Sequence, residues 1–203
     1  MKKALLFYFL LGTIAFSEIV EKQTLTKGNA RHGGFVAAAI TCAEVSDAWY
    51  GMYGFRMGWI INRHFSLGAA YFDMAKYLTH YKVYAPDVVQ PAQNSHYFLL
   101  DTNKAGLELE YFLNPDGQVH ISASALMGIG HIKYEEPAYF EVFIDDRHLF
   151  IEPTVTVNLN ISENVKLNIG FIYRFVSGIR AEGLNNGSLS GFTVSSSLAV
   201  GFF

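Results

Sequence analysis

The chain has 203 residues and a formal net charge of −3, and 51% of its residues are hydrophobic, 15% aromatic and only 16% charged. This length is enough for one domain with a sizeable core or for a closed barrel. The small net charge excludes a general affinity for nucleic acid, and the single cysteine, Cys42, excludes an intrachain disulfide. The mean hydropathy of +0.19 is high for a soluble protein, although no long apolar run follows the N-terminal segment.

Residues 1–17 predict a secretory signal peptide. Two lysines precede an apolar stretch over 4–16, and small residues favour cleavage between Ser17 and Glu18. An uncleaved membrane anchor is the alternative, but the stretch is shorter than the roughly 20 apolar residues that a spanning helix needs. Residues 18–31 show no sustained period, and we expect them to form a periplasmic lead-in that lies across the mouth of a barrel.

Eight segments with alternating polarity follow the lead-in. The clearest is a hairpin over residues 150–178, FIEPTVTVNLNISENVKLNIGFIYRFVSG, in which the odd positions are apolar and the even positions are small or polar. Such alternation is typical of strands with two different faces. Residues that favour turns separate the other segments from one another. The predicted strands are 33–43, 50–61, 65–77, 104–113, 118–134, 150–161, 165–178 and 191–203.

The connections between these strands alternate in length. Short turns on one side and long loops on the other are typical of an up-and-down transmembrane barrel, with the turns in the periplasm and the loops outside. The segments suit tilted spans of about 9–11 residues, and an even strand number closes an antiparallel sheet. The predicted fold class is therefore all-β, an eight-stranded antiparallel up-and-down transmembrane β-barrel over residues 32–203. Tight turns are predicted at 62–64, 114–117 and 162–164, and longer connections at 78–103, 135–148 and 178–190, whereas the connection near 44–49 is short.

Alternation alone does not say which face of the strands is buried. An exported lipocalin-like barrel also has eight alternating strands, but its interior is apolar. Here the polar face carries small residues and only occasional charges, which suits a narrow lumen better than a solvated surface. The apolar face carries many aromatic rings near strand ends, where aromatic girdles form. The chain also stops at LAVGFF, and a final strand ending in Phe203 resembles the insertion signal of outer-membrane barrels.

Four segments carry a resemblance to a known family: RHGGFVAAAI, GWIINRHFSLG, FIEPTVTVNLNI and LNIGFIYRFVSG. They resemble small, functionally uncharacterised outer-membrane barrels of Gram-negative bacteria, whose pattern has an HGG start, a GGWIIN-type second strand and a late hairpin with EPG and YRxVSG. Met57 and Thr154 stand where this pattern usually has glycine. The resemblance covers most of the chain apart from the loops. It implies an eight-stranded outer-membrane barrel and implies no activity.

Charged residues on the polar face are expected to point into the lumen. In a hairpin that turns at Glu163, Glu152 and Arg174 lie directly across from one another. The same count around the turn at 114–117 places Glu110 across from His120. A narrow barrel brings all strands within side-chain reach, and the predicted role of such a network is to plug the lumen and satisfy its charges. A gate or a ligand site in a narrow gated channel is the alternative. The predicted network joins Arg56, Glu108, Glu110, Glu152 and Arg174, beside Lys166, His120 and Asn158.

No catalytic, cofactor-binding or metal site is predicted, because no nucleophile, base and orienting group fall into one arrangement. The alternative is an outer-membrane enzyme that modifies lipid A, since such barrels use serine and histidine near the outer leaflet. Metal binding by His131 with neighbouring loop acids is a further alternative, although acidic loops are more often solvated. The residues concerned are His80, His96, Ser95 and Ser177 for catalysis, and Glu135, Glu136, Asp145 and Asp146 for a metal.

The expected role is therefore structural or surface-binding, in a monomer without cofactors at the cell outer membrane. The expected partners are outer-membrane lipid and lipopolysaccharide, and the barrel-assembly machinery through the C-terminal strand. An extracellular ligand is expected to bind through the loops 78–103 and 135–148. The first of these loops is rich in tyrosine and histidine, which suits a contact surface.

Overall fold

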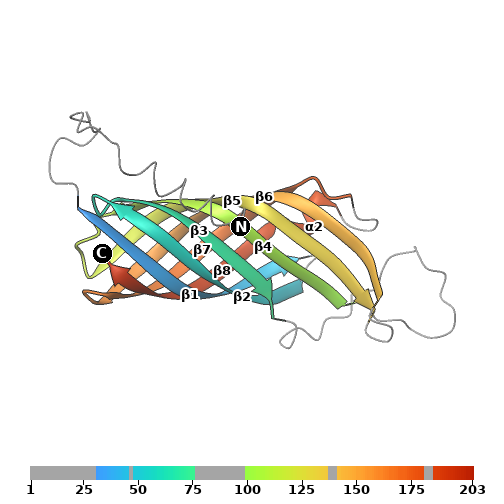
Figure 1. Ribbon diagram of the computed structural model, residues 1–203, viewed down its shortest axis with the longest axis horizontal. Helices are drawn as coiled ribbons and strands as arrows, with labels where there is room; N and C mark the ends of the chain where they lie inside the picture. Colours follow the sequence, from blue (N-terminus) through green and yellow to red (C-terminus); the bar gives the residue numbers. More distant parts are fainter. Residues whose placement is uncertain (1–30, 46–47, 76–98, 137–140, 181–184) are drawn as a thin grey trace, which may run out of the picture. The chain divides into compact units, whose positions relative to one another are not determined.

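The computed structural model describes residues 31–45, 48–75, 99–136, 141–180 and 185–203. They form a closed barrel in which each strand pairs antiparallel with the next along the chain and β8 pairs with β1 (Figure 1). The predicted fold class is confirmed. The predicted signal peptide and lead-in lie outside the described residues, apart from Arg31. The strands are β1 His32–Val45, β2 Ala48–Ile61, β3 Phe65–Met74, β4 Leu99–Leu113, β5 Val119–Glu136, β6 Glu141–Ser162, β7 Val165–Ser177 and β8 Gly191–Phe202.

A four-residue helix, α2 (Asn186–Leu189), precedes β8. The side chain of Asn185 caps it by accepting a hydrogen bond from the Ser188 backbone N–H. The sequence did not predict this turn of helix in the connection over 178–190. Among the described residues, no helix is both long enough and apolar enough to cross a membrane.

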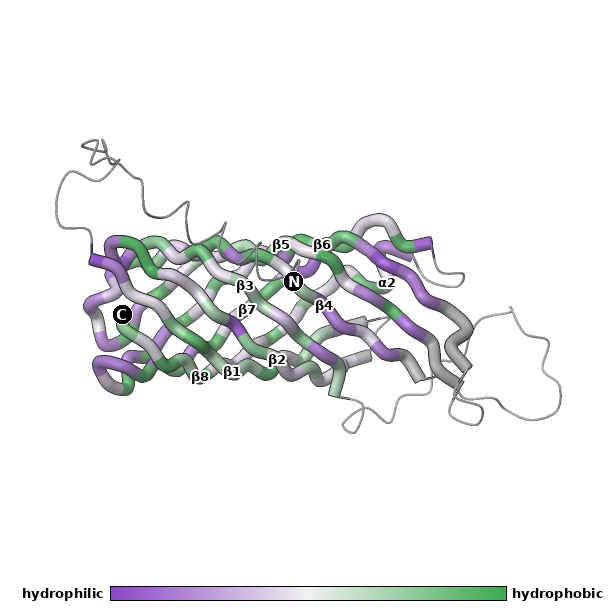
Figure 2. The backbone as a smooth tube through the Cα atoms, in the orientation of Figure 1, coloured by the Kyte–Doolittle hydropathy of each residue, from purple (hydrophilic) through white to green (hydrophobic). Residues whose placement is uncertain are grey.

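Successive side chains alternate between the lumen and the outer surface, as the strand geometry requires. In β7 the side chains of Ile169, Phe171 and Phe175 are exposed, whereas those of Asn168 and Arg174 are buried. The same alternation appears as green and purple bands along the strands in Figure 2. Each of the eight strands carries large apolar side chains that are exposed, so the apolar face points outward and the lipocalin-like alternative is wrong.

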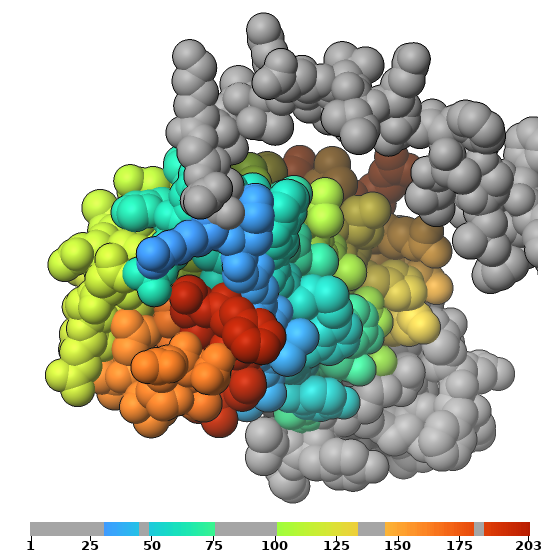
Figure 3. Space-filling model, turned by 60° about the vertical axis from the view of Figure 1, so that its left-hand side comes forward, coloured from blue at the N-terminus to red at the C-terminus, as the bar shows by residue number. Residues whose placement is uncertain are grey.

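The end of the barrel that carries the tight connections is called the turn end here, and the opposite end the loop end. At the turn end, Asn62 and Arg63 have φ angles of 52° and 63°, the left-handed pair that a type I′ hairpin turn needs. Asn114 has a φ angle of 51° in the turn between β4 and β5. The described start of β1 and the end of β8 also lie at the turn end (Figure 3), because an even number of antiparallel strands brings the chain back to the end where it began.

The strands β4, β5 and β6 are longer than predicted. They have 15, 18 and 22 residues, whereas the other five have between 10 and 14. The predicted loop 135–148 is mostly strand, because β5 continues to Glu136 and β6 begins at Glu141. The predicted loop 78–103 likewise ends in strand from Leu99, and residues 76–98 lie outside the described part. Alternation could not reveal these extensions, because above the membrane a strand has no lipid on its outer face.

The outer surface changes character at the loop end of β3 to β6. Along β5, the outward side chains of Ile121, Met127 and Ile129 are followed by His131 and Lys133. The same change occurs on the three neighbouring strands, so an apolar band gives way to a polar rim (Figure 2). The cross-strand register brings the outward polar residues of this rim into neighbouring rows: Asp73, Asn103, His131 and Arg147 in one, and Asp101, Lys133 and Asp145 in the next.

Two lumen glycines show how large side chains fit into so narrow a barrel. A Cβ atom at Gly58 would lie 2.6 Å from the ring of Phe35, and one at Gly130 would lie 2.2 Å from His148 Nε2. Both distances are far below van der Waals contact, so each glycine leaves room for the ring on a neighbouring strand. The small residues of the polar face therefore make room for larger side chains from neighbouring strands, and these side chains fill the lumen.

Candidate functional site

Glu152 lies inside the barrel, where side chains from three strands meet. Arg174 Nε on β7 donates a hydrogen bond to Glu152 Oε1 at 2.6 Å. Lys104 Nζ on β4 donates to both carboxylate oxygens, at 2.5 and 2.7 Å. The Glu152 side chain is only 1% exposed, so these are charge-assisted bonds in a site without bulk water. We call Lys104, Glu152 and Arg174 the Glu152 cluster; with two cations and one acid, its formal charge is positive.

A second cluster, the Arg56 cluster, consists of Arg56 on β2 and of Glu108 and Glu110 on β4. Arg56 makes a bidentate ion pair with the Glu108 carboxylate: Nε donates to Oε2 at 2.9 Å and Nη2 donates to Oε1 at 2.8 Å. Arg56 Nη2 also donates to Glu110 Oε2 at 3.2 Å, and Ser122 Oγ donates to Glu110 Oε1 at 2.6 Å. With one cation and two acids, this cluster has a negative formal charge. The two clusters therefore attract one another along the lumen.

Only a small cavity separates the two clusters. It has a volume of about 30 Å³, and its walls include Arg56, Glu108, Lys104 and Glu152. A cavity of this size holds one or two water molecules. The described lumen is thus filled by side chains at this level.

The structure brings the predicted network residues together in two clusters. Glu152 and Arg174 lie opposite each other, between the ladder pairs Ile151 with Phe175 and Thr154 with Ile172. Arg56, Glu108 and Glu110 meet separately from them. The expected network joins both arginines, whereas no ion pair among the described residues connects the two clusters.

The predicted register between β4 and β5 is also wrong. Glu110 pairs with Ser124, not with His120. The physical reason is the turn, which runs from Asn114 to Gln118 before β5 begins at Val119, so its centre lies later than the predicted one. Because the shift is an even number of residues, Glu110 still points into the lumen.

The predicted network lacks Lys104, because the predicted strand begins at this residue. β4 in fact begins at Leu99, so Lys104 is deep in the lumen and buried. Its ammonium lies 4.9 Å from the centre of the Phe72 ring and 5.6 Å from that of Phe150, within the range of cation–π attraction. The four-residue spacing to Glu108 could have revealed it, since residues at even spacing share one face of a strand.

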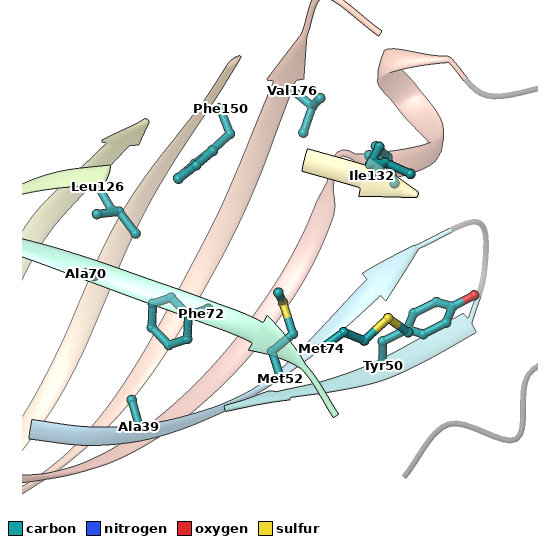
Figure 4. Close-up of a cluster of buried hydrophobic side chains, with 11 residues drawn as sticks. Ala39, Tyr50, Met52, Ala70, Phe72, Met74, Leu126, Ile132, Phe150 and Val176 are labelled. Carbon is teal, nitrogen blue, oxygen red and sulfur yellow. The ribbon is translucent and has the colours of Figure 1, made fainter. Parts of the chain in front are cut away.

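An apolar plug fills the lumen toward the loop end (Figure 4). In Figure 4 the side chains of Phe72, Phe150 and Leu126 project inward from three different strands. The polar face was expected to carry small residues with an occasional charge, so the large inward rings of Phe72 and Phe150 were missed; their even positions were the available signal. The plug comprises Ala39, Tyr50, Met52, Ala70, Phe72, Met74, Leu126, Ile132, Phe150, Val176 and Leu189.

The residues considered for catalysis or metal binding do not converge among those that the structure describes. His131 and Asp145 are hydrogen-bonded on the outer face of β5 and β6. Asp146 accepts hydrogen bonds from the backbone N–H groups of Arg147 and Arg180. As neighbours in one strand, Asp145 and Asp146 point to opposite faces and cannot bind one metal with His131. No group of three or more His, Cys, Asp or Glu side chains with metal-site geometry occurs in the described ranges, which exclude His80, His96 and Ser95.

A closed eight-stranded barrel with an apolar outer band, a side-chain-filled lumen and short turns at one end defines a class, the small outer-membrane β-barrels. The barrel surface lies in the outer-membrane lipid. In bacterial barrels of this class the short turns lie in the periplasm and the longer loops outside.

Solved structures of this class have the same fold. Neisserial surface protein A matches with a TM-score of 0.56 at 15% identity, over 85% of this chain and 99% of that chain. The N-terminal β-barrel domain of Pseudomonas aeruginosa OprF matches at 0.55 and 12% identity, over 86% and 100%. Ail, the attachment invasion locus protein of Yersinia pestis, matches at 0.52 and 8% identity, over 84% and 98%. No family model and no curated protein sequence matches the chain.

Proposed function

We propose that the protein is a non-conducting outer-membrane barrel that presents a binding surface outside the cell on the projecting ends of β4, β5 and β6. The observation that carries this proposal is the greater length of these three strands, together with the polar rim on their outer faces. The proposal includes no catalytic role. Altered acylation of lipid A after expression of the protein would contradict that part.

The filled lumen supports the non-conducting part of the proposal. An ion crossing the barrel would have to pass the apolar plug and both charged clusters, which hold fixed partners at hydrogen-bond distance. An eight-stranded barrel has room for little besides its own side chains. Separating the ion pairs to open a path would leave buried charges without partners, which is costly.

The purified, refolded protein is therefore expected to show no steady single-channel conductance in planar bilayers. Insertion is verified independently, by recovering folded protein from the bilayer-forming vesicles and testing its heat-dependent mobility on gels. Stable conductance steps from verified insertions would contradict the closed lumen and favour a narrow gated channel.

A barrel of this architecture can carry an extracellular binding surface. The matched Ail structure is that of an attachment and invasion protein in complex with a heparin analogue, sucrose octasulfate. In the present chain the rim combines Lys133, Arg147 and His131 with the carboxylates of Asp73 and Asp145. Such a mixture of exposed charges suits a polar macromolecular ligand better than an apolar one.

Shortening the projecting hairpin tests the surface role. Replacing residues 131–147 by a two-residue turn removes the part of the polar rim that lies on β5 and β6. It is expected to abolish attachment of protein-coated particles to extracellular matrix or envelope ligands that the full-length protein binds. Urea unfolding of the shortened barrel should remain cooperative, because the membrane-embedded pairing of β5 and β6 is retained. Unchanged attachment by a folded, shortened barrel would contradict the role of this surface.

We further infer membership of the uncharacterised barrel family whose motifs the sequence resembles. The positions that carry the motifs have architectural roles: His32 stacks on Trp59, Glu152 binds Arg174, and Gly178 has a φ angle of 92°. These roles support a shared barrel architecture rather than a shared reaction. Recognition of the C-terminal strand and Phe203 by the assembly machinery belongs to the same proposal.

A further inference from the structure

The turn end of the barrel contains a second, much larger cavity. Its volume is about 580 Å³, which is in the usual range for small-molecule sites. Phe112, Phe203 and Ile60 provide apolar walls, and Lys166, Arg63 and Asn160 provide polar ones. The cavity lies at the opposite end of the barrel from the polar rim. Figure 3 views this end, where the red C-terminal strand β8 lies beside the blue β1 and the orange β6–β7 hairpin.

Lys166 lines this cavity and differs from the other buried cations. Its side chain is inside the barrel and the residue is only 6% exposed. Lys104, Arg56 and Arg174 each bind a carboxylate directly. In the part of the chain that the structure describes, no carboxylate lies within ion-pair distance of Lys166. Its ammonium faces the cavity with three hydrogen-bond donors, and no described carboxylate accepts from them.

Aromatic rings hold this ammonium at the cavity wall. Lys166 Nζ lies 3.9 Å from the centre of the Phe203 ring and 5.4 Å from that of Phe112. Cation–π attraction offsets part of the cost of burial, but it does not satisfy the N–H donors. The rings leave the ammonium next to apolar surface, so a bound anion with an apolar group would contact both.

Asn160 provides a complementary acceptor beside Lys166. The two residues are cross-strand partners in the β6–β7 ladder. Asn160 Nδ2 donates to the backbone oxygens of Gly117 and Pro115, at 2.7 and 3.3 Å. Asn160 Oδ1 is buried and has no hydrogen-bond partner among the described residues. Because Oδ1 is buried, a ligand donor next to the anionic oxygen would reach it once the Asn160 amide turns toward the cavity, and the ligand would then satisfy both side chains.

The other charges in the walls limit the charge of the ligand. Arg63 is paired with Asp116 across two turns, so it adds no free positive charge. Glu163 lies on the rim of the cavity and would repel a polyanion. Among the described residues that line the cavity, Lys166 is then the single unpaired cation, and one cation matches one negative charge.

From this geometry we infer a periplasmic binding site for a small monoanionic carboxylate that carries an apolar group and a neighbouring N–H or O–H donor. The carboxylate binds the Lys166 ammonium, the donor binds Asn160 Oδ1, and the apolar group packs against Phe112 and Phe203. The site is independent of the proposed surface role at the loop end.

N-acetylphenylalanine is a suitable probe, because it has a carboxylate, an adjacent N–H and an aromatic ring. Titrated into the folded full-length barrel in a non-ionic detergent, it is expected to bind saturably in the millimolar range and to shift the backbone amide NMR signals of Lys166, Asn160 and Phe203. The neutral N-acetylphenylalanine amide should bind about ten-fold more weakly, since it lacks the charge-assisted bond. Equal binding of acid and amide would overturn the inference, as would the absence of saturable binding.

The variant Lys166→Met keeps the length and apolar stem of the side chain and removes the charge. It is expected to weaken binding of N-acetylphenylalanine about ten-fold. The matched control is Lys133→Met on the polar rim, which should bind like the wild type. Unfolding in urea shows whether each variant is folded. If a folded Lys166→Met barrel bound the probe as tightly as the wild type, the assignment of Lys166 would be wrong.

Discussion

Replacing Glu152 by glutamine is expected to lower the free energy of unfolding by about 3–5 kcal/mol. The substitution keeps the shape of the side chain but leaves Lys104 and Arg174 as two like charges in a buried site. In the wild-type protein, Lys104 and Arg174 each donate a hydrogen bond of 2.7 Å or less to a Glu152 carboxylate oxygen. Removing the shared anion leaves their desolvation uncompensated and adds their mutual repulsion. Urea unfolding followed by tryptophan fluorescence measures the change.

Replacing the cations that Glu152→Gln leaves unpaired should restore much of the lost free energy of unfolding. The double variant Glu152→Gln with Arg174→Met is expected to be more stable than the single variant. Adding Lys104→Met should raise stability again, because a buried ion cluster can often be replaced by apolar groups without loss. The control Glu163→Gln removes an exposed carboxylate from the β6–β7 turn and should change stability by less than about 0.5 kcal/mol. If the single, double and triple variants unfold at the same urea concentration, Lys104, Glu152 and Arg174 are not energetically coupled.

The strands within the membrane could be predicted because lipid imposes a period of two on them. A residue such as Phe171 must be apolar and its neighbour Gly170 must fit a narrow lumen, so the sequence itself carries the alternation. The projecting parts of β5 and β6 have water on their outer face, and there the pattern breaks down. The residues over 141–148 pair with β5, with one register shift between Tyr134 and Glu135, yet their sequence, EVFIDDRH, contains no period that separates strand from loop.

The interior could be predicted only where a turn fixes the register. The short turn at Glu163 placed Glu152 opposite Arg174 by simple counting, and their hydrogen bond of 2.6 Å agrees with that count. Contacts between strands far apart in sequence were not accessible in this way. Lys104 reaches Glu152 from β4 across the lumen, and that contact depends on how the closed barrel staggers its strands. The same limit explains why one network was expected where two clusters exist.

A filled lumen also explains why glycines occur on its wall. Gly128 on β5 pairs with Gly106 on β4, and both lie on the lumen face of their strands. A Cβ atom at Gly128 would lie 1.9 Å from the Ala105 carbonyl oxygen and 2.5 Å from the Cα of Gly106. Both atoms belong to the backbone, so no side-chain rotation can relieve the overlap. The two strands would have to separate, and their hydrogen bonds would lengthen.

Gly128→Ala is therefore expected to destabilise the barrel by about 3 kcal/mol or more, at the upper end of the costs of overpacking. The expected result is a marked fall in the urea midpoint, or loss of the compact form that migrates faster on unheated gels. Gly34→Ala is the matched control, because a Cβ atom there would meet its nearest neighbour, the Gly58 carbonyl oxygen, at 3.4 Å. That distance is an ordinary contact, so the control should fold and unfold like the wild type. Equal stability of the two variants would mean that β4 and β5 can separate without cost, and the glycine pair would then not determine how closely these strands approach.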